Sequence, residues 1–415
     1  MQTVDLDQLA YLTADEPGIA GKLKQRPEDF IVDEEPLYEP TGQGDHLYLF
    51  VEKRRRLTTD VTRLFREHFG VKEVAIGYAG LKDKHAITRQ WFSVEHASAE
   101  RAAEFADEHI HILATDRHLN KLKRGHLRGN RFIIKLRDVE LNDVVRVRRM
   151  LDRMCRCGVP NYLGEQRFGY RRNNHLLGQL LMLGKYREFL DEMLGRPIPA
   201  DSPPAAEARH AYMAGDYVTA LECWPKVHRF ERQAIGPLSR GASPSQAVNG
   251  IDRPQLALLM SAYQSYIFNL VLNKRVRDGL FDTMLAGDLA FKHDSRGVFL
   301  VEDVAETQQR CDAKLICPTG PMWGPDMMRA GGQVDQWELD ALRSTGMDVS
   351  DLVASKRAPE GSRRAMRMLI DEPAVSAGSD EFGPYIELRF MLPRGSFATT
   401  VMREIMKNGA PRDDD

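Results

Sequence analysis

One acidic residue of this chain, Asp83, stands among cations in the stretch AGLKDKHAITRQWFSV, residues 79–94. Lys82 and Lys84 flank it, and His85 follows closely. Nearby positive charge keeps a carboxylate ionised, and a cationic loop attracts a phosphate backbone. An ionised acid held where a nucleic acid docks could act on a nucleotide as a nucleophile or a base. The alternative interpretation is a surface turn whose charges are only solvated.

The segments on either side of Asp83 predict how it is positioned. Residues 74–80, VAIGYAG, read as a buried strand that ends in glycine, and residues 91–94, WFSV, read as a second strand. We therefore expect Asp83 to lie in a loop between two strands.

The rest of residues 21–157 alternates between the strand and helix patterns. One helix is expected at residues 58–70, with Thr58, Thr59 or Asp60 as its cap, and another at residues 141–158, ending at glycine. Strand runs interrupted by few helices predict an α+β domain with a largely antiparallel or mixed sheet. The expected strands are FIVDEE (30–35), HLYLFVEK (46–53), HIHILATD (109–116) and RFIIKLRDV (131–139).

From about residue 170 the pattern becomes helical. Residues 175–195 and 254–279 are helix-like, the latter with aromatic residues expected in a core, whereas the Pro- and Ala-rich residues 200–211 read as a loop. Strand and helix signals return at residues 385–392 and from Ser396. We expect an α+β domain formed by residues 1–157 and 362–415, interrupted by a mostly helical α+β insertion at 158–361. The aromatic residues of the helix at residues 254–279 that are expected in a core are Tyr263, Tyr266 and Phe268.

Composition narrows the setting. No apolar run approaches the roughly 18 residues that span a bilayer, and the acidic start MQTVDLDQLA lacks a secretory pattern. Five scattered cysteines give no disulfide framework, so a reducing cytoplasm is expected. The net charge is −2, but cations gather at residues 53–56, 117–131 and 363–367, which suits a specific anionic ligand.

Five ordered segments resemble the TruD family of pseudouridine synthases, over nearly the whole chain. The segment around Asp83, GLKDKHAITRQ, resembles the family's signature, in which the aspartate is catalytic. The resemblance implies a pseudouridine-synthase-like catalytic domain interrupted by the family's insertion (TRUD) domain. The other four segments are KQRPEDFIVDEE (24–35), HLNKLKRGHLRGNRF (118–132), GVPNYLGEQRFG (158–169) and LPRGSFATTVMREIM (392–406).

The resemblance also implies roles for single residues. Asp83 is the expected nucleophile or base, and Phe132 the ring that stacks on the detached base, unless it is an ordinary core residue. Asn130 lies on the same face of the expected strand and would hydrogen-bond the base or position Asp83. Lys24 is the first choice for the cation near Asp83, and Phe30 would shape the pocket; the alternatives are a surface lysine and a core phenylalanine.

The expected substrate is tRNA, with uridine 13 as the usual target of the family. The reaction needs no metal and no cofactor, and a monomer is the default expectation. Basic side chains next to Asn130 and Phe132 are expected to face the RNA. They are His118, Lys121, Lys123, Arg124, His126 and Arg128.

Two other classes of function remain open from the sequence. One is an RNA-binding protein that keeps the scaffold without turnover. The other is a metal-dependent nuclease or hydrolase that combines Asp83 with His109, His111 or Cys155. Metal sites need several ligands in a set geometry, and no such spacing is present. No dinucleotide or Walker glycine motif is present either.

Overall fold

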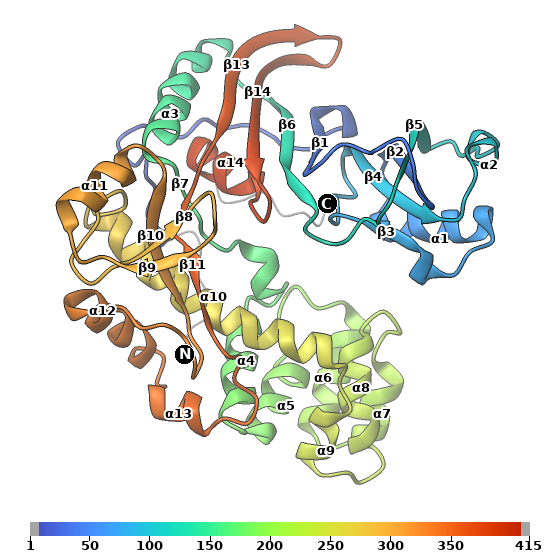
Figure 1. The fold of residues 1–415 in the computed structure, drawn as a ribbon. Coiled ribbons are helices and arrows are strands. Elements are labelled where there is room, and N and C mark those ends of the chain that lie inside the picture. Colours follow the sequence, from blue (N-terminus) through green and yellow to red (C-terminus); the bar gives the residue numbers. More distant parts are fainter. Residues whose placement is uncertain (1–7, 408–415) are drawn as a thin grey trace. The chain divides into compact units, whose positions relative to one another are not determined.

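The computed structural model describes residues 8–407, and these divide into two compact units (Figure 1). One unit comprises residues 11–159 and 368–407, and the other comprises residues 8–10 and 160–367. The boundaries after residues 159 and 367 each fall inside a short strand, β7 (Val159–Pro160) or β12 (Arg367–Met368). The second boundary lies later than the expected residue 361, because β11 (Ser362–Ala365) pairs with β10 (Ile316–Met322).

An eight-stranded mixed sheet forms the centre of the first unit. Its order is β13-β14-β6-β1-β4-β2-β5, with β3 paired to β4, and only β1 and β4 are described as parallel neighbours. The mixed sheet predicted from the sequence is confirmed. The strands are β1 (Phe30–Pro36), β2 (His46–Arg54), β3 (Ile76–Tyr78), β4 (Ile87–Glu95), β5 (Ile110–His118), β6 (Leu127–Arg137), β13 (Asp371–Asp380) and β14 (Gly383–Pro393).

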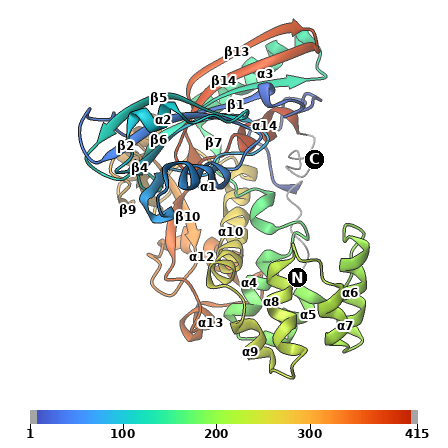
Figure 2. The same cartoon turned by 90° about the vertical axis from the view of Figure 1, so that its right-hand side faces the viewer.

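Helices cover this sheet through two apolar cores. Helices α3 (Val144–Cys157) and α14 (Ala398–Met406) pack on a core that contains Phe30, Phe132 and Phe390. Helix α1 (Thr58–Phe69) packs on β2 and β4 in a second core, and α2 (Ala99–Ala103) adds to it (Figure 2). Three short 3₁₀ turns, Pro27–Asp29, Glu73–Ala75 and Leu141–Asp143, complete the unit.

The start of α1 differs from the expectation. None of Thr58, Thr59 and Asp60 is its N-cap, because the helix begins at Thr58 and Leu57 takes the cap position. The Asp60 carboxylate lies in the first turn and accepts the Leu57 N–H at 2.9 Å. A carboxylate at this position satisfies a donor that the helix leaves free and also complements the helix dipole.

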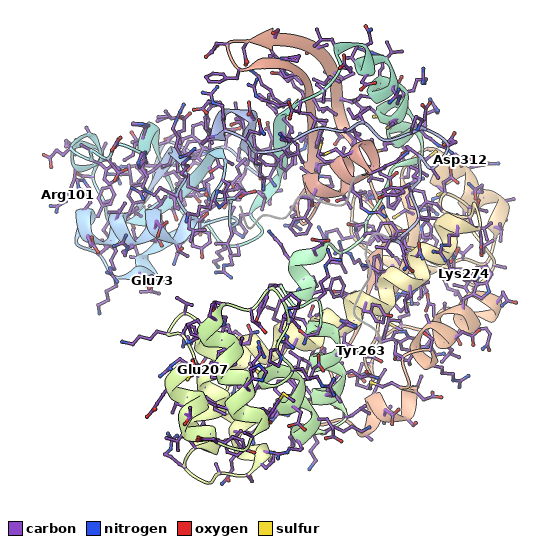
Figure 3. All side chains as sticks on the ribbon, turned by 180° about the vertical axis from the view of Figure 1, so that it is seen from behind. Glu73, Arg101, Glu207, Tyr263, Lys274 and Asp312 are labelled. Carbon is purple, nitrogen blue, oxygen red and sulfur yellow. The ribbon has the colours of Figure 1, made fainter. Side chains whose placement is uncertain are left out.

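Helix α10 (Arg253–Arg277) is the axis of the second unit, with α4 (Asn174–Met182) packed against it (Figure 1). Tyr263 and Phe268 of α10 are fully buried, as expected, and Tyr266 is half-buried (Figure 3 labels Tyr263). A four-stranded sheet, β11-β10-β8-β9, accompanies the helices. The remaining elements are α5 (Tyr186–Leu194), α6 (Pro203–Met213), α7 (Tyr217–Cys223), α8 (Arg229–Leu238), α9 (Pro244–Asn249), β8 (Leu289–Lys292), β9 (Val298–Leu300), α11 (Val304–Asp312), α12 (Gly332–Arg343), α13 (Val349–Ala354) and the 3₁₀ turn η5 (Glu165–Phe168).

The expected loop at residues 200–211 is wrong, because α6 begins there at Pro203. Two prolines occupy the first turn of α6, where a missing N–H costs nothing, and the alanines that follow favour a helix. The expected helix at residues 175–195 is two helices, α4 and α5, separated at Gly184, whose φ is 68°.

Candidate active site

Asp83 lies in the loop that joins the antiparallel strands β3 and β4, as predicted. Its Oδ2 atom lies 2.5 Å from Lys24 Nζ, and its Oδ1 atom accepts the His85 N–H at 3.2 Å. The Asp83 side chain is 28% exposed and that of Lys24 is 11% exposed. The loop therefore presents a carboxylate that is accessible on one side and paired with a mostly buried cation.

Lys53 holds the backbone of this loop. Its ammonium group donates to the Asp83 carbonyl at 2.7 Å and to the Arg56 carbonyl at 2.6 Å, and the residue is fully buried. Burial lowers the pKa of Lys53 to about 8, although the Asp83 charge opposes this shift. The basic run at residues 53–56 thus begins with a cation that faces the interior and not the solvent.

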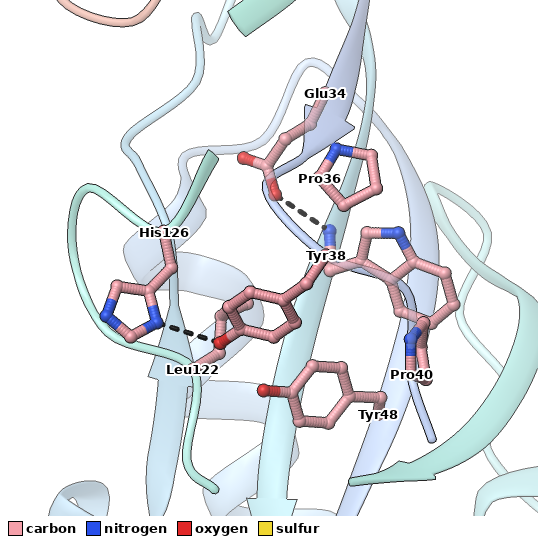
Figure 4. A pocket seen from close by; sticks show the side chains of 8 residues that line it. Glu34, Pro36, Tyr38, Pro40, Tyr48, Leu122 and His126 are labelled. Carbon is pink, nitrogen blue, oxygen red and sulfur yellow. Dashed lines mark hydrogen bonds between the residues drawn. The ribbon is translucent and has the colours of Figure 1, made fainter. Parts of the chain in front are cut away.

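Lys82, the neighbour of Asp83, does not contact the carboxylate of Asp83 in the structure. Its amine forms an ion pair with Glu34, and the two side chains are 4% and 1% exposed. Glu34 also accepts the Trp91 N–H at 3.2 Å (Figure 4). Burial raises the pKa of Glu34 despite the Lys82 charge.

Two neutral side chains complete the support of the loop. The Lys82 N–H donates to Thr58 Oγ1 at 2.9 Å, and Thr58 donates in turn to Gln90 Oε1 at 3.1 Å. Gln90 Nε2 then donates to the Gly80 carbonyl at 3.1 Å. The loop is therefore fixed at residues 80, 82 and 83 by side chains from β1, β2, α1 and β4, which limits the freedom of the Asp83 carboxylate.

Aromatic rings lie beneath Lys24. Its Nζ atom lies 4.7 Å from the centre of the Phe30 ring, and the Phe30 and Phe132 rings meet edge to face at 6.2 Å. Lys24 has a φ of 53°, a left-handed conformation that is uncommon outside glycine. Phe30 is 4% exposed and Phe132 is 6% exposed, so the structure places both in the core.

The face of β6 that carries Phe132 is the main core face, where Ile134 and Leu136 also lie. The sequence left open which face of this strand was the core face, and the burial pattern decides it. Phe132 contacts Phe390 of β14 at 5.6 Å between ring centres.

Asn130 precedes Phe132 on the same face of β6. Its Oδ1 atom is buried and has no hydrogen-bond partner among residues 8–407. An unpaired buried carbonyl oxygen costs about 1–3 kcal/mol. Asn130 therefore offers an acceptor that a donor from a bound molecule would satisfy.

The basic segment before β6 packs against the start of the Asp83 loop. The Gly125 N–H donates to the Ala79 carbonyl at 2.8 Å, and the Leu122 N–H donates to Ser93 Oγ at 3.0 Å. A Cβ atom added at Gly77 would lie 2.2 Å from the Leu122 carbonyl oxygen, so only glycine permits this contact.

The cations of this segment differ from the expectation in their exposure. His118 is only 8% exposed, because its ring stacks on Tyr38 at 4.9 Å and contacts Tyr48 at 5.0 Å, so little of this side chain is available to an RNA. Lys121 donates to the Val74 carbonyl, and Arg124 donates to the Tyr78 hydroxyl at 2.8 Å. The exposed cations are Lys123, Arg124 and Arg128.

His126 belongs to an aromatic pocket beside this segment (Figure 4). Its Nδ1 atom lies 2.8 Å from the Tyr38 hydroxyl, and Tyr48 donates to the Asn120 carbonyl at 2.9 Å. Burial raises the pKa of the Tyr48 hydroxyl, so it stays protonated near neutral pH. The pocket is lined by Glu34, Pro36, Tyr38, Pro40, Tyr48, Trp91, Leu122 and His126.

Within residues 8–407, no three side chains of the His, Cys, Asp or Glu type are grouped so that they could hold a metal ion. His109 directly precedes β5 and His111 lies in it, whereas Cys155 lies on α3. Nor does any helix in the described part of the chain combine the length and apolar character that a membrane span requires.

Comparison with known proteins agrees with this architecture. The family described as tRNA pseudouridine synthase D (TruD) matches residues 7–405. The tRNA pseudouridine synthase D of Syntrophotalea carbinolica is 39% identical over 398 residues, covering 96% of this chain and 98% of its own. That of Geobacter sulfurreducens is 38% identical over 405 residues, with coverages of 96% and 98%.

A solved TruD structure from Methanosarcina mazei has the same fold. The two structures superpose with a TM-score of 0.85 at 26% sequence identity, over 97% of this chain and 96% of the other. From the family match over nearly the whole sequence, the identity to these relatives and the shared fold, this chain belongs to the TruD family of tRNA pseudouridine synthases.

Proposed function

We propose that this protein isomerises one uridine of tRNA, at position 13, to pseudouridine, with Asp83 as the catalytic residue. In this reaction the N1–C1′ bond breaks and a C5–C1′ bond forms, while C5 loses a proton and N1 gains one. No electron is gained or lost, so the reaction requires no oxidant and no reductant. The Asp83 carboxylate either attacks C1′ or removes a proton from C2′.

The observation that carries this proposal is the pairing of Asp83 with Lys24 in a loop held by buried contacts. A carboxylate that reacts with the sugar must stay ionised and must keep its position while the base detaches. Lys24 supplies the opposite charge at 2.5 Å, and Lys53 fixes the Asp83 carbonyl at 2.7 Å. The 28% exposure of the Asp83 side chain leaves room for a substrate to approach.

Asn130 and Phe132 support a uracil as the detached group. Uracil carries an N–H donor, which the unpaired Oδ1 atom of Asn130 can accept. The Phe132 ring, two residues along the same face, can stack on the base, and such stacking contributes about 1–3 kcal/mol. Because Phe132 is 6% exposed, we expect only the edge of its ring to be accessible before the base binds.

The test is conversion of unmodified tRNA in the presence of a metal chelator, followed by chemical mapping of pseudouridine. We expect the wild type to modify a single uridine, and Asp83→Asn to bind the same tRNA within a few-fold but to convert none. Asp138→Asn is the matched control, since Asp138 is an exposed carboxylate that pairs with Lys22 at 2.6 Å. It should convert tRNA at the wild-type rate.

Other outcomes would separate the alternatives. Modification of another uridine would refute the position and keep the chemistry. Binding without conversion by the wild type would favour a non-catalytic RNA-binding protein. Cleavage that appears only when a divalent metal is supplied would favour a nuclease.

A further inference from the structure

Three closely spaced arginines end the unit of residues 160–367, and the terminal nitrogens of two of them are well bonded inside the protein. Arg363 forms a two-pronged ion pair with Glu338, at 2.6 and 2.7 Å. Arg367 donates to the carbonyl oxygens of Cys311 and Ile316 at 2.6 and 3.0 Å. These two side chains hold the fold together.

Arg364 makes fewer bonds. One of its terminal nitrogens donates to Asn161 Oδ1 at 2.8 Å, and its Nε atom, like that of Arg367, is buried and has no partner among the described residues. Its guanidinium lies over the ring of Phe268 on α10, 5.5 Å from the ring centre. No ion pair within residues 8–407 joins Arg364 to a carboxylate.

Arg167 is a second cation of this kind. It lies in the 3₁₀ turn η5, is half-buried, and reaches Ser261 Oγ of α10 at 3.4 Å. Burial alone lowers the pKa of Arg167, and no carboxylate opposes that effect. Burial also lowers the pKa of Arg364 to about 10, with the charge of Arg167 as the second cause.

Helix α10 offers contacts to both arginines on one face. The backbone of Leu163 is bonded in both directions to the Asn269 side chain, at 2.9 Å each, so the segment from Asn161 to Arg167 runs along the helix. Ser261 and Phe268 are two turns apart on one face of α10, and they contact Arg167 and Arg364 respectively.

Two cations that share one helix face without a counter-ion repel each other, and their partial burial weakens the screening by water. An anion between them relieves both costs. Guanidinium groups match the oxygens of a phosphate through paired N–H donors, and Asn161 and Ser261 each add a neutral polar atom beside one of the two arginines. Arg363 nearby, in contrast, has its charge met by Glu338 within the same unit.

We propose that Arg167 and Arg364 form a phosphate-binding site for the backbone of the RNA substrate. This inference rests on the proposed function for the identity of the ligand, and it assigns an RNA contact to the unit that does not contain Asp83. The two residues act by binding the substrate and take no part in the bond changes.

The experiment compares the wild type with Arg167→Gln, Arg364→Gln and the double variant. Arg310→Gln is the matched control, since Arg310 is an arginine of the same unit that lies 3.9 Å from Glu306. In a first arm, thermal unfolding is followed with and without inorganic phosphate, in the absence of RNA. Phosphate should raise the Tm of the wild type and of the control more than that of the double variant.

In a second arm, tRNA binding is measured over a range of salt concentrations. The double variant should bind at least about ten-fold more weakly, and the slope of log Kd against log salt should fall by about one or two. KM for conversion should rise by a similar factor with kcat unchanged. Arg364→Lys, which keeps the charge but not the paired donors, should recover only part of the affinity.

An equal response to phosphate together with unchanged tRNA affinity in the double variant would overturn the site. The single variant Arg167→Gln keeps the test valid if the double variant unfolds, because Arg167 is half-buried in a short turn. Failure of the proposed function is distinguishable: a wild type that converts no uridine, with variants that still lose phosphate and RNA binding, refutes the enzyme and keeps the site.

Discussion

The buried pair of Lys82 and Glu34 provides the sharpest test of how the Asp83 loop is held. Lys82→Met removes one charge and leaves the other in a position that is 1% exposed. Loss of one partner of a buried ion pair costs about 3–5 kcal/mol, because the remaining charge keeps its desolvation penalty without compensation. At about 2–4 °C per kcal/mol for a unit of this size, the Tm should fall by roughly 6–20 °C.

The stability lost in Lys82→Met should become smaller as the pH falls. Burial already raises the pKa of Glu34, and removal of Lys82 raises it further. The folded state of the variant then binds a proton that the unfolded state releases, so its stability rises as the pH falls towards the ordinary glutamate range. Denaturant unfolding of Lys82→Met at pH 7 and pH 5 should show a smaller deficit at pH 5.

Two further variants complete the assay. Lys22→Met is the matched control, since the Lys22–Asp138 pair has a short distance of 2.6 Å but is 61% and 64% exposed, and its loss should cost less than about 1 kcal/mol. Lys82→Met combined with Glu34→Gln should regain most of the stability, although turnover stays low because the loop has lost its tether. Equal losses in Lys82→Met and Lys22→Met would refute the reasoning.

Two other predictions concern the residues around this loop. Lys53→Met should reduce turnover at least about ten-fold with tRNA affinity kept, because the bonds to the Asp83 and Arg56 carbonyls are lost. The pKa of Lys53 is about 8 in the folded protein and 10.5 for an ordinary lysine, so the unfolded chain binds more protons between these two values. The free energy of unfolding of the wild type should therefore rise relative to that of Lys53→Met by about 2–3 kcal/mol from pH 8 to pH 10. A difference between the two proteins that stays constant over this range in denaturant unfolding would contradict this. Phe132→Ala should destabilise the protein by about 3–5 kcal/mol, since Phe132 is a core residue. Phe132→Leu should keep the fold but slow conversion by roughly 5- to 150-fold through lost stacking, and wild-type conversion rates for this variant would exclude a stacking role.

The sequence predicted the fold where local pattern and tertiary packing agree. The strands of the mixed sheet and the hairpin that carries Asp83 follow from alternating apolar residues and their breaks. Helix α6 was missed because its prolines suggested a loop, although they occupy the one turn of a helix that tolerates them. The unit ends at residue 367, a few residues after the expected 361, because β11 is a short strand whose partner, β10, lies in the other predicted domain.

The exposure of His118 could not be predicted from its neighbours in the sequence. It stands in a segment rich in cations, which favoured a position that faces RNA. Its ring is instead buried by Tyr38 and Tyr48, and these come from β2 and the segment before it. Contacts between segments that are distant in the sequence decide whether a cationic side chain is solvated. The number of charged residues near it in the sequence does not reveal these contacts.

The buried charged residues, in contrast, could be recognised in the sequence, because they occupy the same alternating positions of a strand as the apolar core residues. Lys53 follows Leu47, Leu49 and Val51 at intervals of two on β2, and all four are buried. A charge in phase with a core face must find a partner or shift its pKa. On β1, Glu34 continues the buried positions 30 and 32 in the same way.

The partners of these in-phase charges converge on one loop. Lys53 binds the Asp83 carbonyl, and Glu34 binds the amine of its neighbour Lys82. A polar atom that is buried without a hydrogen-bond partner costs free energy, so each such atom in the fold needs an explanation. The Oδ1 atom of Asn130 and the Nε atom of Arg364 are two such atoms, and a uracil edge at the first or a phosphate at the second would supply the missing partner.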